Sequence, residues 1–147
     1  MANLNARFAM DSDREEQGVW VNFGGGDPHA EPPVPDIKVQ IRRFKSKASA
    51  AARAELERPY VAEMRRGPLP QEVAEEILLR QLARGVIVNW SGIQDDNKQE
   101  IPYSPETAYQ FVKTLPEFRD DIFNVSVERD VYKKRADEEG KENLLTT

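Results

Sequence analysis

At 147 residues, with 39% hydrophobic and 32% charged residues and a net charge of −5, the chain has the size and composition of one ordinary globular domain. That size excludes a large multidomain enzyme, and the absence of cysteine excludes both a disulfide framework and a thiolate zinc site. The charge is uneven, because residues 1–35 carry −4, residues 36–84 carry +4 and residues 85–147 carry −5. A basic centre between acidic ends suits an acidic partner or closure of the chain on itself.

The N-terminal third of the sequence predicts a β-hairpin behind an arm. Residues 1–16 have neither the basic start nor the apolar core of a signal peptide, and we expect a flexible arm there. The segments GVWVNFG and DIKVQIRRF then alternate β-branched and polar residues, which predicts two half-buried strands within residues 17–44. The Gly- and Pro-rich stretch between them, GGGDPHAEPPVP, predicts a mobile hairpin tip.

Two helices are predicted in the centre of the chain. From Ser46 the sequence is rich in Ala, Arg, Glu and Leu, which predicts a helix over about 47–58 that Pro59 ends or kinks. Pro70 is expected at the first position of the next helix. The apolar stripe of that helix is formed by Val73, Ile77, Leu78, Leu82 and Val86. The following run VIVNW fits a helix or a short strand, and the four-residue spacing that ends at Trp90 favours a helix.

Two more helices and a charged end complete the predicted fold. Ser104 is expected to cap a helix with Pro105 at its first position, and Pro116 starts another that reaches about Tyr132. The predicted fold class is α+β, mainly α, with an N-terminal β-hairpin followed by about four helices. We expect one domain over 17–132, with the hairpin at 17–44, the helical part at 46–132 and a flexible charged tail at 133–147.

Patterns that suggest ion binding or catalysis each lack a required residue. Asp95, Asn97 and Gln99 alternate as in an EF-hand loop, but Glu100 stands where that loop needs glycine, so a polar turn is preferred. FGGGD after a strand lacks the spacing of a phosphate-binding loop, and the only histidine, His29, lies on the predicted mobile tip. We therefore expect no enzyme activity, no cofactor, no metal site and no small-molecule substrate.

A basic cluster, IRRFKSK, is the sequence feature that best fits contact with nucleic acid. Its charges are Arg42, Arg43, Lys45 and Lys47, enough for salt-sensitive binding to phosphates. The acidic net charge and the lack of several stacking aromatics favour a polar strand face instead. We expect no nucleic-acid partner and, without a long apolar run, no membrane insertion.

The stretch GVIVNWSGIQDDNKQEIPYSPETAYQFVKTLPEFRDDIFNVS resembles the tail assembly chaperones of long-tailed bacteriophages. The likeness covers residues 70–127, and more loosely the segment upstream, through an acidic turn followed by PYSPE and a PEF helix start. The matching positions are Trp90, Gly92, Asp95, Asp96, Ile101, Pro102, Tyr103, Ser104, Pro105, Glu106, Phe118 and Arg119. We interpret this stretch as a rigid corner between two helices, in which Tyr103 and Ile101 anchor the turn onto the helix of Trp90.

The resemblance implies a function without catalysis. Such a chaperone keeps the tape measure protein soluble and assists assembly of the tail tube protein around it, in the host cell cytoplasm, and is absent from the finished virion. Homo-oligomers are a further expectation from the resemblance. The alternative from another class is a structural virion protein, such as a head-tail connector or a minor tail component.

The last predicted helix supplies a candidate surface for such a partner. Its apolar side chains outnumber what one side of a small core requires, and we expect them to contact another polypeptide. The predicted partner-binding residues are Phe118, Ile122, Phe123, Val127, Val131 and Tyr132. The alternative that some of them belong to the core stays open at this point.

Overall fold

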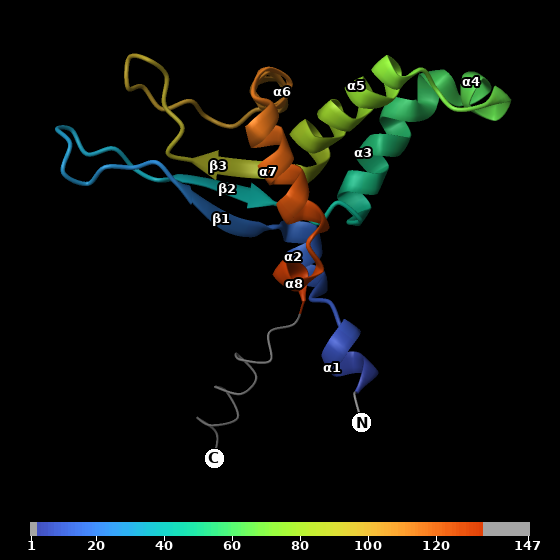
Figure 1. Cartoon of the computed structure of the whole chain (residues 1–147), viewed down its shortest axis with the longest axis horizontal. Helices are drawn as coiled ribbons and strands as arrows, with labels where there is room; N and C mark the ends of the chain where they lie inside the picture. Colours follow the sequence, from blue (N-terminus) through green and yellow to red (C-terminus); the bar gives the residue numbers. More distant parts are fainter. Residues whose placement is uncertain (1–2, 134–147) are drawn as a thin grey trace.

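The structure, a computed structural model, describes residues 3–133 and has the predicted fold class, α+β and mainly α (Figure 1). The elements in chain order are α1 (Leu4–Phe8), α2 (Ser12–Gln17), β1 (Val19–Gly24), β2 (Ile37–Ile41), α3 (Lys47–Glu57), the 3-10 turn η1 (Arg58–Tyr60), α4 (Val61–Arg66), α5 (Gln71–Gln81), the π-helical turn η2 (Leu82–Val86), β3 (Ile87–Ser91), α6 (Pro105–Thr114), α7 (Pro116–Val127) and α8 (Arg129–Tyr132). The tail expected at 133–147 lies outside the described residues except for Lys133.

The sheet is antiparallel, with β2 between β1 and β3. Val39 and Ile41 of β2 face the helices and are fully buried, whereas the opposite face carries exposed side chains such as Trp20 and Lys38. The core forms between the covered face and the helical segments α5–η2, α6 and α7, as its buried residues Leu82, Val112 and Ile122 show. One face of the sheet is therefore buried against the helices and the other is exposed to solvent, as the predicted alternation of apolar and polar residues in β1 and β2 requires.

The run that was predicted to continue a helix to Trp90 forms β3 instead. This strand contains a bulge. Ile87 pairs with Ile41 and Asn89 pairs with Gln40, so Val88 is an extra residue without a partner in β2. A bulge places two residues three apart on the same face, and Ile87 and Trp90 are both buried. The four-residue spacing of Leu82, Val86 and Trp90, which favoured a helix, crosses the boundary between η2 and β3, and it was misleading because all three residues are buried.

Prolines lie at helix boundaries in the arm formed by α3, α4 and α5, as expected. α3 begins after Ser46, whose side chain accepts from the N–H of Ser49, and its α-helical part ends before Pro59. Pro70 is the residue just before α5, one position earlier than predicted, and makes no side-chain hydrogen bond to the helix. Figure 1 shows α3 and α5 side by side, with α4 joining them at the far end of the arm.

α5 passes into the π-helical turn η2 at the place where α3 packs closest to it. A Cβ atom on the buried Gly85 would lie 2.9 Å from the Cβ of Ala52 and 3.1 Å from the Cα of Ser49. Glycine is therefore needed for the close approach of the two segments. Directly beside it, the buried Gln81 donates its amide N–H groups to the Oγ and the carbonyl oxygen of Ser49 (2.9 and 3.3 Å).

The final predicted helix is divided at Glu128, which has an extended backbone. The carbonyl oxygen of Ser126 accepts from the N–H of Phe44 (2.8 Å). This carbonyl therefore bonds to the segment after β2 and not to the next turn of a continuing helix. The break turns α8 under the sheet, where the hydroxyl of Tyr132 donates to the carbonyl oxygen of Ile41 (3.0 Å). A single straight helix would not bring Tyr132 to β2.

The second half of the expected N-terminal arm is part of the folded unit. Arg14 of α2 donates twice to the carbonyl oxygen of Val131 (2.9 and 3.1 Å). Glu15 forms an ion pair with Arg43 at 2.6 Å, which joins α2 to the end of β2. Residues 12–17 are thus a helix held between the sheet and α8 rather than a free arm.

We predict that Gly85→Ala lowers the free energy of unfolding by about 1–3 kcal/mol, because the added methyl overpacks the contact with α3. Intrinsic helix propensity acts in the opposite direction, since alanine is favoured over glycine by about 1 kcal/mol. Urea unfolding of Gly85→Ala is compared with Ala62→Gly, an exposed α4 position that measures propensity alone. An increase in stability on Gly85→Ala would show that the close approach is not a constraint.

Candidate functional site

The loop between β3 and α6 is ordered by its own acidic turn. The Oδ1 of Asp95 accepts from the N–H groups of Asn97 and Gln99 (2.9 Å each), and Gln94 and Glu100 form an isolated β-bridge. This is the polar turn that the sequence favoured over an EF-hand loop. Among residues 3–133, no three His, Cys, Asp or Glu side chains converge in a way that could hold a metal ion.

Trp90 and Tyr103 lock this loop onto the body of the protein. The indole N–H of Trp90 donates to the carbonyl oxygen of Ile101 (2.7 Å), and the Trp90 and Tyr103 rings meet edge to face at 5.1 Å. The Tyr103 hydroxyl lies 2.8 and 2.9 Å from the carbonyl oxygens of Ala83 and Ile87, between which it shares its hydrogen. Burial raises the pKa of Tyr103 above its ordinary value, so the hydroxyl stays a donor into more alkaline solution than an exposed tyrosine would.

Three further residues of the predicted corner fix the course of its backbone. Ser104 accepts from the N–H of Thr107 (3.1 Å), and Pro105 is the first residue of α6, as the sequence predicted. Gly92 has φ +80°, and a Cβ there would lie 2.1 Å from the carbonyl oxygen of Asp36. Only glycine fits this crossing of the β1–β2 and β3–α6 connections, which leave the same end of the sheet in Figure 1.

An apolar groove lies beside the locked corner, which contributes Ile93 to the lining and supports Phe111 through Trp90. We call it the corner groove; it encloses about 330 Å³ between the α6–α7 junction and the end of the sheet, and it is lined by Phe23, Ile37, Ile93, Phe111, Leu115, Glu117, Phe118 and Asp121. The rings of Phe111 and Phe118 meet edge to face at 6.4 Å, and Trp90 supports Phe111 from behind at 5.6 Å. Leu115, at the turn between the helices, is 50% exposed.

The predicted partner-binding residues are divided by the structure. Ile122 and Tyr132 are completely buried, so they belong to the core and are not available to a partner. Phe123 is partly buried and packs edge to face on Phe44 at 5.4 Å, and the carbonyl of the partly buried Val131 is bonded by Arg14. The stripe on the last helix therefore faces inward over most of its length.

Only Phe118 of the predicted set lies in the corner groove, while Val127 is 46% exposed beside a separate, mixed polar hollow. The sequence reasoning missed Leu115 and the floor of the groove. Leu115 had a usable signal, because an apolar residue between two helices and just before Pro116 has few ways to be buried. Phe23 and Ile37 gave no such signal, since they look like ordinary strand residues.

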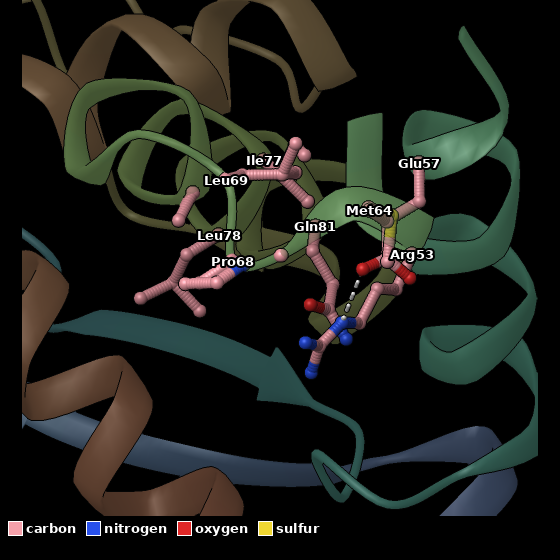
Figure 2. A pocket seen from close by; sticks show the side chains of 10 residues that line it. Arg53, Glu57, Met64, Pro68, Leu69, Ile77, Leu78 and Gln81 are labelled. Atoms are coloured by element: carbon pink, nitrogen blue, oxygen red, sulfur yellow. Dashed lines mark ion pairs between the residues drawn. The ribbon is translucent and has the colours of Figure 1, made fainter. Parts of the chain in front are cut away.

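A second hollow, the α3–α5 cleft, lies where α3 and α5 diverge and α4 crosses over (Figure 2). It encloses about 450 Å³ and is lined by Arg53, Glu57, Met64, Gly67, Pro68, Leu69, Ala74, Ile77, Leu78 and Gln81. Figure 2 shows apolar side chains from α5 and the preceding loop at one end and the Arg53–Glu57 ion pair, at 3.4 Å, at the other. Its charges are thus already matched within α3.

The basic cluster at the end of β2 is largely occupied by internal contacts. Arg42 donates to the carbonyl oxygen of Glu16 (2.6 Å), and Arg43 pairs with Glu15. Lys45 and Lys47 are exposed. Two of the four cations that suggested phosphate binding therefore serve to hold α2.

We predict that Tyr103→Phe lowers the free energy of unfolding by about 1–2 kcal/mol, because the partners of its hydroxyl lose their donor. Tyr60→Phe is the matched control, since Tyr60 is also partly buried but its hydroxyl makes no hydrogen bond with residues 3–133. Chemical denaturation measures both variants. Equal, small effects would mean that the corner is held by ring packing alone.

Comparison with known families places the chain in context. The family described as YdaY prophage protein matches residues 44–143, which are 100 of the 147 residues. The matched part contains every element from α3 to α8 and all of the corner groove except Phe23 and Ile37. No curated protein and no solved structure matches the chain. In the described part of the chain, no helix is both long and apolar enough to cross a membrane.

Proposed function

The chain belongs to the YdaY prophage protein family, and from this premise we propose that it is a phage tail assembly chaperone. The family is phage-derived, which agrees with the coarser part of the sequence resemblance. In the proposed role the protein binds the tape measure protein and assists assembly of the tail tube around it, without catalysing a reaction. It acts in the host cell cytoplasm and leaves before the virion is complete.

The corner groove is the observation that carries this proposal. It is mainly apolar and open, and six of its eight lining residues lie within the stretch, residues 70–127, in which the sequence resembles tail assembly chaperones. Its lining residue Phe111 packs on the ring of Trp90, which is itself held by a hydrogen bond, so this part of the groove is preformed for an incoming apolar segment. A preformed site reduces the entropy that binding must overcome.

The size of the groove suits reversible binding. Complete burial of one Leu or Phe side chain contributes about 1.5–3 kcal/mol, and a groove of this volume accepts only two or three such anchors. Loss of free motion on association opposes this by about 4 kcal/mol or more. Each docking event is therefore weak, as a chaperone that must release its client requires.

We predict that Leu115→Asp weakens capture of the tape measure protein of the same prophage at least fivefold, because the charge removes an exposed apolar anchor. The thermal transition should shift by no more than about 2 °C, since half of the Leu115 side chain is already in water. Leu4→Asp on α1, at a position 74% exposed and outside the groove, is the matched control. Co-expression and pull-down measure capture, and calorimetry measures the transition.

Two results would contradict the proposed function. One is a wild-type protein that neither captures the tape measure protein nor raises its soluble fraction on co-expression. The other is stoichiometric retention of the chain in purified virions, which would favour a head-tail connector or minor tail component. Quantitative mass spectrometry of purified particles distinguishes these roles.

A further inference from the structure

The charged residues that line the corner groove are all of one sign, whereas the other hollows carry both signs. Glu117 and Asp121 are its only charged lining residues, and both are acidic. Neither takes part in any of the ion pairs formed within residues 3–133. In the α3–α5 cleft, by contrast, Glu57 is neutralised by Arg53. The groove thus combines an apolar floor with carboxylates that have no cationic partner in the described part of the chain.

The two carboxylates form one edge of the groove because of their spacing. Glu117 lies in the first turn of α7, and Asp121 follows four residues later, so both project from the same side of the helix. Like charges at this spacing repel each other, and a cation placed between them relieves the repulsion. Asp120, which points elsewhere on the helix, is already paired with Arg119 at 3.3 Å.

We infer that the corner groove binds a basic amphipathic segment of a partner polypeptide. The apolar side chains of this segment enter between Phe111, Leu115 and Phe118. Lys or Arg side chains about one turn away along the segment reach the Glu117–Asp121 edge. This is the helix-in-groove mode of recognition with charge complementarity at the rim. The inference rests on the proposed function for the identity of the partner, which is then a basic, apolar segment of the client.

The same charges argue against other classes of partner. Nucleic acid and anionic membrane surfaces present phosphates, which the Glu117–Asp121 edge repels. A segment with acidic flanks is disfavoured in the same way. Complementary charge at a rim acts mainly on the choice of partner and on the rate of association, while the apolar floor supplies the attraction.

The test uses the full-length protein and two synthetic helical peptides of about 18 residues, five turns each. Both peptides carry the same leucine stripe, and their flanking positions are Lys in one and Glu in the other. Fluorescence anisotropy at low salt should show about tenfold tighter binding of the Lys peptide, and the preference should shrink at about 1 M salt, where charges are screened.

The double substitution Glu117→Lys/Asp121→Lys should reverse the preference, so that the Glu peptide binds more tightly. Glu72→Lys/Glu75→Lys on the exposed side of α5 is the matched control, because it changes the net charge equally and leaves the groove intact. Circular dichroism shows whether each variant is folded. If the Lys variant does not fold, Glu117→Gln/Asp121→Gln replaces it, and this variant should abolish the preference between the two peptides.

A preference for the Lys peptide that persists in the groove variants, or that the α5 variant loses equally, would overturn the inference. Capture of the tape measure protein is measured separately. If the wild-type protein fails to capture it, the proposed function is contradicted while the peptide result still decides the inference. If capture succeeds and is unchanged by Glu117→Lys/Asp121→Lys, the function stands and the charge selectivity is wrong.

Discussion

Trp90 donates its indole N–H to the carbonyl oxygen of Ile101, and Tyr103 shares its hydroxyl hydrogen between the carbonyl oxygens of Ala83 in η2 and Ile87 at the start of β3. These bonds join the β3–α6 loop to the core. Partly buried hydrogen bonds of this kind are costly to break, because the separated groups cannot all regain water. The start of α6, and through it the position of Phe111 and Phe118 in the corner groove, depends on this contact.

Local rules predicted the elements whose signals lie within a few residues. Ser46 and Ser104 cap helices, Pro59 ends one, and period-two alternation marks β1 and β2. β3 was missed because the four-residue spacing of Leu82, Val86 and Trp90 continues from the helical turn η2 into the strand, and all three residues are buried. The division of the last helix at Glu128 was missed because its cause, the bond from Phe44 to Ser126, joins residues far apart in the sequence.

The candidate site was only partly predictable for the same reason. The motif around Trp90 and Tyr103 is contiguous, so a corner at this place followed from the sequence, but it joins the strand β3 to α6 and not two helices as predicted. An apolar stripe, however, does not say which of its residues face the core, and Ile122 and Tyr132 are buried. The groove also takes Phe23, Ile37 and Ile93 from three separate segments, and only the packing of the sheet end against α7 brings them together.

The proposed function joins these features into one physical account. The bonds of Trp90 and Tyr103 position the α6 side of the corner groove. The small contact area of the groove keeps binding weak, and the Glu117–Asp121 edge favours apolar segments that carry basic residues. The structure offers a second hollow, the α3–α5 cleft, which is larger but has its charges paired internally. The account therefore assigns the client to the α6–α7 side of the molecule and not to the helical arm.

Site-specific photo-crosslinking tests that assignment most directly. A photoreactive amino acid replaces Leu115 in the corner groove or, in a separate variant, Met64, which is 40% exposed in the α3–α5 cleft. Each variant is co-expressed with the tape measure protein of the same prophage and irradiated. The account predicts a covalent adduct from position 115 and none from position 64. An adduct from position 64 alone would contradict it.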